Sequence, residues 1–167
     1  MKEIDWSSLS FGYMKTDYNV RCWYRNGAWG EIEISSEETL NIHMAATCLH
    51  YGQEAFEGLK AYRCPDGKVR VFRMDENAAR LQSSCRGIMM PEMPTELFEE
   101  MVTKVVRLNE AYIPPYESGA SLYIRPLLIG TGVQVGVKAA NEYLFIIFVT
   151  PVGPYFKEGF KPVQIQI

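Results

Sequence analysis

The sequence of 167 residues lacks the features that mark several large classes of protein. It has no Cys-x-x-Cys pair, and its two histidines, His43 and His50, lie near only one of its four cysteines, Cys48. A zinc site needs tighter paired spacing, so no metal site is predicted. The cysteines are expected to be reduced, mostly buried thiols, as is usual in the cytosol.

Long apolar runs and clustered charge are also missing. The longest apolar stretch, Tyr143 to Val149, has only the length of a strand, so the sequence predicts no membrane span. The first residues, Met1 to Trp6, contain no apolar segment of a signal peptide, which favours a cytoplasmic protein. The net charge is −3 and the arginines are dispersed, so no nucleic-acid surface is indicated.

The composition itself is that of an ordinary globular protein, with 47% hydrophobic and 22% charged residues. Aromatic residues make up 13% of the chain and include ten tyrosines. Tyrosine has one apolar and one polar end, which suits the walls of pockets and interfaces. The length suffices for one domain with its own core, or for one domain and the beginning of another.

Two hairpins are predicted in the first half of the chain. The segments 22–25 and 29–34 flank Asn26-Gly27, a dipeptide that accepts the positive φ angles of a type I′ turn. A second hairpin is predicted over residues 59–73, where Pro65-Asp66-Gly67 has good turn chemistry.

Two helices are predicted to follow the hairpins. Apolar residues recur at helical spacing from Met74 to Ile88, with Asp75 as the expected N-terminal cap. A second apolar stripe runs from Thr95 to Tyr112, and Pro114-Pro115 is expected to end that helix.

Strands are predicted again after the helices. Residues 120–129 and 142–150 are dense in apolar and aromatic side chains, and the second segment is apolar on both faces, as a central strand would be. The order of strands, two helices and strands favours an α+β fold, an antiparallel sheet with two helices on one side. Residues 160–162 are interpreted as a linker. Residues 163–167 begin an alternating strand without a partner, so the chain is expected to be a piece of a longer protein.

A glycine-rich segment, Gly130 to Gly136, approximates the dinucleotide-binding fingerprint but is one residue too long. It precedes a predicted loop and strand, whereas a pyrophosphate site needs a helix N-terminus at this point. The segment is therefore interpreted as a flexible loop of small residues.

Two arginines invite two interpretations each. Tyr123 and Arg125 share one face of a predicted strand, where a phenol and a guanidinium could receive a carboxylate. The pattern alone favours the alternative, an exposed pair on a half-buried sheet. Arg80 lies off the apolar stripe of its helix, which is typical of a solvated arginine and also compatible with a phosphate anchor.

Five motifs in a fixed order resemble branched-chain-amino-acid aminotransferases, which are enzymes of fold type IV that use pyridoxal 5'-phosphate (PLP). The resemblance covers nearly the whole chain, from about Phe11 onward. The motifs are Leu49 to Gly52, Phe56 to Tyr62, Asn77 to Leu81, Ser121 to Thr131 (in part), and Pro151 to Phe156.

The resemblance implies roles for individual residues in the small N-terminal domain of that fold. Arg80 matches the arginine that binds the PLP phosphate. The residues that match the substrate pocket are Phe11, Tyr51, Phe56, Tyr123, Arg125 and Tyr155, with Arg125 near the substrate carboxylate. Val135 and Val137 match loop residues that reach the site of the neighbouring subunit in the family homodimer.

The same resemblance implies a limit, because none of the lysines of this chain matches the Schiff-base lysine of the family. Lys60 lies in a predicted strand near the motifs, and a structural role is expected for it. Residues 1–159 are expected to form the small domain and 160–167 the linker and start of a C-terminal PLP domain. The whole protein would transfer the amino group of leucine, isoleucine or valine to 2-oxoglutarate, as in branched-chain amino acid biosynthesis, while this part alone would be inactive.

Other functions remain open at this point. D-amino-acid aminotransferase and aminodeoxychorismate lyase share the fold, although the Tyr123–Arg125 pair and the run Pro151 to Tyr155 favour the branched-chain type. A different class of function, a non-catalytic module for dimerisation or ligand binding, would suit a naturally short protein.

Overall fold

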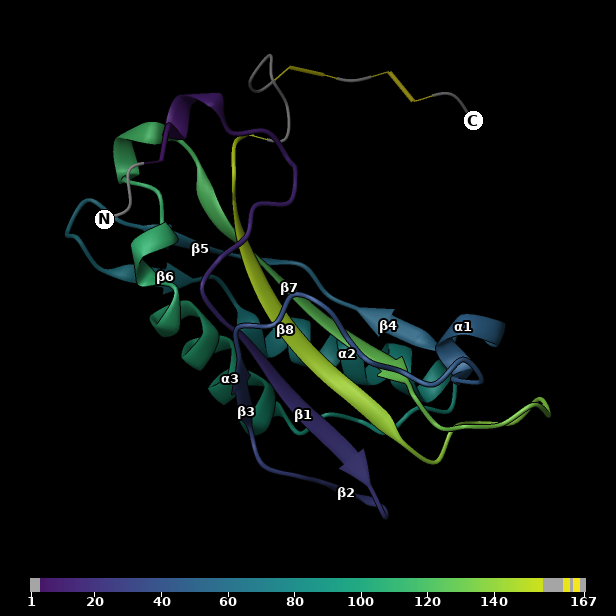
Figure 1. Cartoon of the computed structure of the whole chain (residues 1–167). Coiled ribbons are helices and arrows are strands. Elements are labelled where there is room, and N and C mark those ends of the chain that lie inside the picture. Colours follow the sequence, from purple (N-terminus) through teal and green to yellow (C-terminus); the bar gives the residue numbers. More distant parts are fainter. Residues whose placement is uncertain (1–3, 155–160, 163, 166–167) are drawn as a thin grey trace.

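The computed structural model describes residues 4–154, 161–162 and 164–165. Its helices and strands form an α+β domain, as the order of elements predicted (Figure 1). The strands are β1 (Asn19–Arg25), β2 (Ala28–Trp29), β3 (Glu33–Ser35), β4 (Glu54–Phe56), β5 (Leu59–Arg63), β6 (Val69–Val71), β7 (Ser121–Gly130) and β8 (Tyr143–Val152). The helices are α1 (Thr47–Tyr51), α2 (Met74–Gly87) and α3 (Thr95–Leu108), with 3₁₀ turns at Trp6–Ser8, Glu110–Tyr112 and Tyr116–Ser118.

All strand pairs are antiparallel and belong to one sheet of order β2-β1-β8-β7-β5-β6. The short strand β3 also pairs with β1, and β4 pairs with the end of β7 beyond β5. The two long strands at the centre, β7 and β8, pair over ten residues each. Strand β8 is buried along nearly its whole length, which confirms the prediction of a central strand.

The main core lies between one face of the sheet and helices α2 and α3, which lie behind the sheet in Figure 1. The apolar stripe of α3 supplies Phe98, Met101, Val102 and Val105, which have no exposed surface. Alternate strand residues meet it, and the most deeply buried of them are Val20, Cys22, Leu122, Ile124, Phe145 and Ile147. Full burial of one such side chain contributes roughly 1.5–3 kcal/mol, so this layer holds the helices on one side of the sheet.

The opposite face of the sheet, here called the outer face, carries a smaller apolar cluster of Ile129, Leu144 and Ile146. Partly buried side chains around it, among them Leu40 and Leu127, complete the cluster. Two segments without regular structure cross this face, residues 9–18 before β1 and residues 36–46 after β3 (Figure 1). The sheet is therefore covered on both sides, by helices on one and by chain segments on the other.

The first hairpin has the predicted turn but an interrupted second strand. Asn26 and Gly27 have φ angles of 53° and 81°, which confirms the type I′ turn. The predicted strand 29–34 is wrong in its middle, because β2 ends at Trp29 and β3 begins at Glu33. The pairing register with β1 shifts by one residue between them, so the strand accommodates an extra residue as a bulge does.

Two details of the helices also differ from the predictions. The N-cap of α2 is Arg73, in a left-handed conformation and without a side-chain cap, so the assignment of Asp75 as the cap is wrong. Asp75 lies in the first turn, where its negative charge interacts favourably with the positive end of the helix dipole. Helix α3 ends at Leu108 and not at Tyr112, because the Asn109 side chain donates to the Val105 carbonyl (2.8 Å) and a 3₁₀ turn follows.

The predictions for the C-terminal end, a linker at 160–162 and a strand at 163–167, fall partly on residues that the structure does not describe. Residues 155–160, 163 and 166–167, and with them most of the expected strand 163–167, lie outside the described residues. Gln164 and Ile165, which are described, belong to no strand.

Candidate functional site

The local feature that organises the candidate site is a break between β4 and β5 opposite Pro126. Both short strands pair with β7, β4 at residues 127–129 and β5 at residues 122–124. Proline has no N–H to donate to a ladder, so pairing is interrupted beside it. Glu57 lies in the gap and donates its own N–H to the Pro126 carbonyl (2.9 Å). The register with β7 is the same on both sides of the gap, so Glu57 continues the alternation that buries Ala55 and Leu59 on the helix side of the sheet.

Glu57 holds Arg80 of α2 through a two-pronged ion pair. Arg80 Nε donates to Glu57 Oε1 (2.8 Å) and Nη2 donates to Oε2 (2.7 Å). The amide of Asn77, one helical turn earlier, also donates to Glu57 Oε2 (2.8 Å). These bonds to Glu57 and its negative charge raise the pKa of the Arg80 guanidinium above its ordinary value. Glu57 was not assigned a role from the sequence, although it lies within the motif Phe56 to Tyr62.

The two members of this pair have very different exposure. The Glu57 side chain is 3% exposed, whereas that of Arg80 is 67% exposed. Glu57 occupies Nε and one hydrogen of Nη2, so Nη1 and the other Nη2 hydrogen remain as donors. This fixed, positively charged edge of Arg80 suits a phosphate oxygen, so the residue fits the phosphate group of PLP. PLP itself acts as an electron sink for carbanions when it is bound.

Tyr123 and Arg125 lie on the same face of β7, as their spacing predicted. Arg125 Nε donates to the Tyr123 hydroxyl (3.1 Å), and the Arg125 guanidinium lies over the Phe56 ring at 4.5 Å from its centroid. The Phe11 ring meets Tyr123 edge-on, with centroids 5.1 Å apart. Phe11 and Phe56 are 43% and 60% exposed. The four residues thus form a partly open surface with one guanidinium between aromatic rings.

Gly58 allows this surface to pack against the break. A Cβ atom at Gly58 would lie 2.8 Å from the Tyr123 hydroxyl, closer than real Cβ atoms approach. Lys60, two residues later in β5, lies opposite Tyr123 in the sheet register. Together with Asn77 and Tyr123, it borders a shallow groove at this end of the sheet.

A second predicted group lies at α1 and the loop after β7. The hydroxyl of Tyr51, the last residue of α1, donates to the carbonyl of Val135 in that loop. The Val135 and Val137 side chains are 85% and 86% exposed. The structure therefore joins Tyr51 to this loop through a hydrogen bond and leaves both valine side chains at the surface.

Tyr155 lies outside the described residues. Of the predicted site residues, the structure thus brings Phe11, Phe56, Tyr123 and Arg125 into direct contact. Arg80 and Tyr51 lie in separate contacts, with Glu57 and with Val135.

The described part of the chain contains neither a cluster of metal ligands nor a helix that could span a membrane. No group of three or more His, Cys, Asp or Glu side chains in residues 4–154 and the described C-terminal positions is arranged to hold a metal ion. No helix of the described residues combines the length and the apolar character needed to cross a membrane.

Solved structures with this fold define the class of protein. The branched-chain amino acid aminotransferase of Escherichia coli matches with a TM-score of 0.61 and 29% identity, over 84% of this chain and 41% of that chain. The branched-chain aminotransferase of Thermoproteus uzoniensis, solved with norvaline, matches with a TM-score of 0.63 and 25% identity, over 83% and 43%. No protein-family model matches the chain.

Sequence relatives narrow the class. The branched-chain-amino-acid aminotransferase of Haemophilus influenzae is 49% identical over 162 residues, which are 97% of this chain and 47% of that protein. The Helicobacter pylori protein of the same name is 48% identical over 161 residues, with coverage of 96% and 47%. The resemblance stated from the motifs is thereby confirmed: the chain is homologous to part of a branched-chain-amino-acid aminotransferase. It spans about half the length of the curated relatives it matches.

Proposed function

We propose that this chain is the N-terminal part of a PLP-dependent transaminase that moves the amino group of leucine, isoleucine or valine to 2-oxoglutarate, giving glutamate. The observation that carries the proposal is the surface of Phe11, Phe56, Tyr123 and Arg125. It combines aromatic rings, which suit an aliphatic side chain, with a guanidinium, which suits a carboxylate. The match of nearly all of this chain to proteins named branched-chain-amino-acid aminotransferase supports the same reaction.

In the proposed reaction the residues of this chain bind and orient. Arg80 holds the cofactor phosphate through the edge that Glu57 leaves free, and Arg125 receives the carboxylate of the substrate, glutamate in particular. Phe11, Phe56 and Tyr51, together with Tyr155, exclude water from the aliphatic side chain. Tyr123 donates its hydroxyl proton toward the same carboxylate while it accepts a hydrogen bond from Arg125 Nε.

The remaining chemistry is proposed to come from outside this chain. Residues 1–159 form the small domain, and 160–167 lead into a C-terminal domain with the lysine that bonds PLP. In the proposed homodimer, the exposed Val135 and Val137 approach the site of the neighbouring subunit. A cytoplasmic location is proposed for the whole protein, and fractionation of source cells would test it.

An assay of the gene product in two forms tests the function. The 167-residue chain alone should not convert leucine and 2-oxoglutarate to 4-methyl-2-oxopentanoate and glutamate, whereas the product of the whole reading frame should. Arg125→Gln in the whole product should raise KM for 2-oxoglutarate, because a carboxylate partner is lost. A preference for D-alanine, or a reading frame without a second domain that contains a lysine, would refute the proposal.

A further inference from the structure

A small cavity lies on the outer face of the sheet, and none of its lining residues belongs to the proposed substrate surface. Its volume is about 180 Å³, and it lies between two crossing segments, residues 13–18 and 36–40. Its floor is apolar, formed by Leu127 of β7 and by Ile146 and Phe148 of β8. Arg125 is the cross-strand partner of Phe148, so the cavity is next to the candidate site but separate from it.

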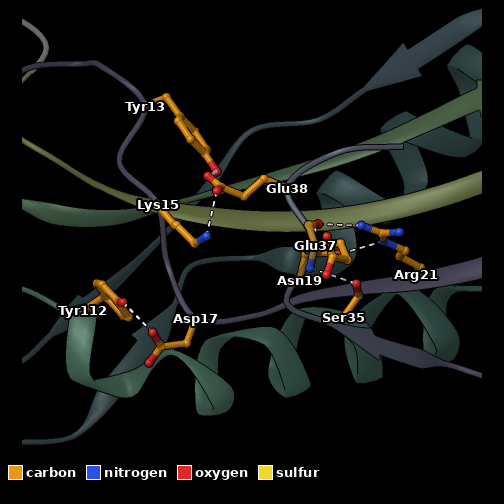
Figure 2. Close-up of polar contacts among 9 residues, drawn as sticks. All are labelled: Tyr13, Lys15, Asp17, Asn19, Arg21, Ser35, Glu37, Glu38 and Tyr112. Carbon is orange, nitrogen blue, oxygen red and sulfur yellow. Dashed lines mark hydrogen bonds and ion pairs between the residues drawn. The ribbon is translucent and has the colours of Figure 1, made fainter. Parts of the chain in front are cut away.

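One wall of this cavity carries a guanidinium in an unusual setting. Arg21 of β1 lies opposite Ile146 in the sheet register and is partly buried. Its Nε donates to Asn19 Oδ1 (2.8 Å) and its Nη2 to the Glu37 carbonyl (2.6 Å), as Figure 2 shows. Both acceptors are neutral. Among the described residues Arg21 forms no ion pair within 4.0 Å, although Glu33 is its cross-strand partner on β3, so the guanidinium is held in place by neutral acceptors.

Two acidic residues, Glu37 and Glu38, also line the cavity, and the side chain of Glu38 is already paired. Glu38 accepts a hydrogen bond from the Tyr13 hydroxyl (2.8 Å) and forms an ion pair with Lys15 (2.8 Å), which fastens one crossing segment to the other (Figure 2). The Tyr13 ring packs edge-on against Phe148, with centroids 6.2 Å apart. The two crossing segments are thus already held together without a ligand, so binding would cost little conformational entropy. Arg21 is the one arginine or lysine among the described residues that line the cavity.

We propose that this cavity is a second small-molecule site, which binds a monocarboxylate with a short branched aliphatic tail. The tail lies on Leu127, Ile146 and Phe148, and the carboxylate meets Arg21. The size agrees, because an apolar cavity of about 150 Å³ holds a benzene molecule, so about 180 Å³ holds a tail of four to six carbons. A guanidinium beside an apolar floor selects an anion with an apolar tail over a neutral or a fully polar molecule.

The test uses two probes that differ only in charge, 4-methylpentanoate and its neutral amide, 4-methylpentanamide. Each is titrated into the 167-residue chain and followed by the methyl NMR signals of Leu127 and Ile146. We expect saturable shifts of both signals, with a dissociation constant for the carboxylate on the order of millimolar, as suits so few atoms. Arg21→Gln should lower the ratio of carboxylate to amide affinity by about tenfold, since a charge-assisted hydrogen bond is lost.

Two further variants make the result decisive. Leu40→Trp, which fills the cavity from its side wall, should abolish the shifts with both probes. Arg125→Gln, on the same face of the sheet, should leave the affinity ratio unchanged. The proposal is overturned if saturating probe moves neither methyl signal, if the ratio is unchanged in Arg21→Gln, or if Arg125→Gln is the variant that lowers it. A general loss of stability in a variant would weaken binding of both probes alike, so it would leave the ratio of carboxylate to amide affinity unchanged. Because Arg21 has no part in the proposed transamination, failure here and failure of the transaminase assay are distinguishable.

Discussion

The buried carboxylate of Glu57 accepts two hydrogen bonds, of 2.8 and 2.7 Å, from the exposed guanidinium of Arg80. Since only Glu57 is buried, the two partners should not contribute equally to stability. Arg80→Ala leaves a buried charge with Asn77 as its remaining side-chain donor, and we expect a loss of about 1–3 kcal/mol. In Glu57→Gln the exposed guanidinium of Arg80 can be solvated by water, so this variant should lose less stability than Arg80→Ala. Urea unfolding of both variants measures this, and an equal or reversed order would contradict the burial argument.

Gly58→Ala should disturb the candidate site more than the fold. The new Cβ atom would displace the Tyr123 hydroxyl, which is the mobile end of a side chain, so the stability loss should stay below about 1 kcal/mol. The hydrogen bond from Arg125 to Tyr123 should be lost with that movement. A crystal structure of the variant, or the NMR signal of Arg125 Nε, would detect the loss.

Gly153→Ala provides the matched comparison. There the new Cβ atom would strike the backbone carbonyl of Leu9, which cannot rotate away. We expect a loss of about 1–3 kcal/mol from overpacking, with a lower melting temperature than for Gly58→Ala. If the two alanine variants melt together, backbone and side-chain obstacles are equivalent here and the prediction fails.

Acid should release the two segments that cross the outer face of the sheet. Lys15, followed by Tyr13, holds the pKa of Glu38 below its ordinary value of 4.5. The folded state therefore binds fewer protons here than the unfolded state. The stabilisation is complete above about pH 4.5 and is lost as the pH falls through the folded pKa. Amide protection near Tyr13, measured as the exchange rate relative to the intrinsic rate at each pH, should fall in that window in the wild type, whereas in Glu38→Gln it should be low already at pH 7.

The cysteines should differ in their reactivity toward thiol reagents. Burial raises the pKa of Cys85 to about 11, and its side chain has no exposed surface. Very little thiolate is then present at pH 8, and no reagent reaches it. Mass spectrometry after brief alkylation should find partly exposed Cys64 labelled first and Cys85 unlabelled until denaturant is added. Early labelling of Cys85 would show that helix α2 opens locally.

The long helices and central strands followed from local patterns in the sequence, whereas the short elements α1 and β4 were not predicted. The turn at Asn26-Gly27, the stripe of α3 and the density of apolar residues in β8 each depend on neighbours within a few residues. Element ends were less predictable. Helix α3 stops at Leu108 because Asn109 bonds to Val105 and also accepts bonds from the backbone of Asp17 and Tyr18, which lie about 90 residues away in sequence.

The candidate site also has a part that local sequence patterns predicted and a part that they did not. Alternation along a strand was sufficient to place Tyr123 and Arg125 on one face, and the motifs were sufficient to identify the family that the chain resembles. No local pattern indicated that Phe11 would touch Tyr123, because more than a hundred residues separate them.

The sequence by itself determined the two long helices, the central strands, the turn of the first hairpin and the family that the chain resembles, because periodicity, turn chemistry and motif order are local properties. Only the tertiary structure decided that Glu57 holds Arg80 and that Arg21 faces a cavity without forming an ion pair among the described residues. Those relationships depend on sheet order, on the packing of α2 against β4 and on the paths of the crossing segments. Such features arise when distant parts of the chain pack together to bury their apolar faces, and no single segment encodes them.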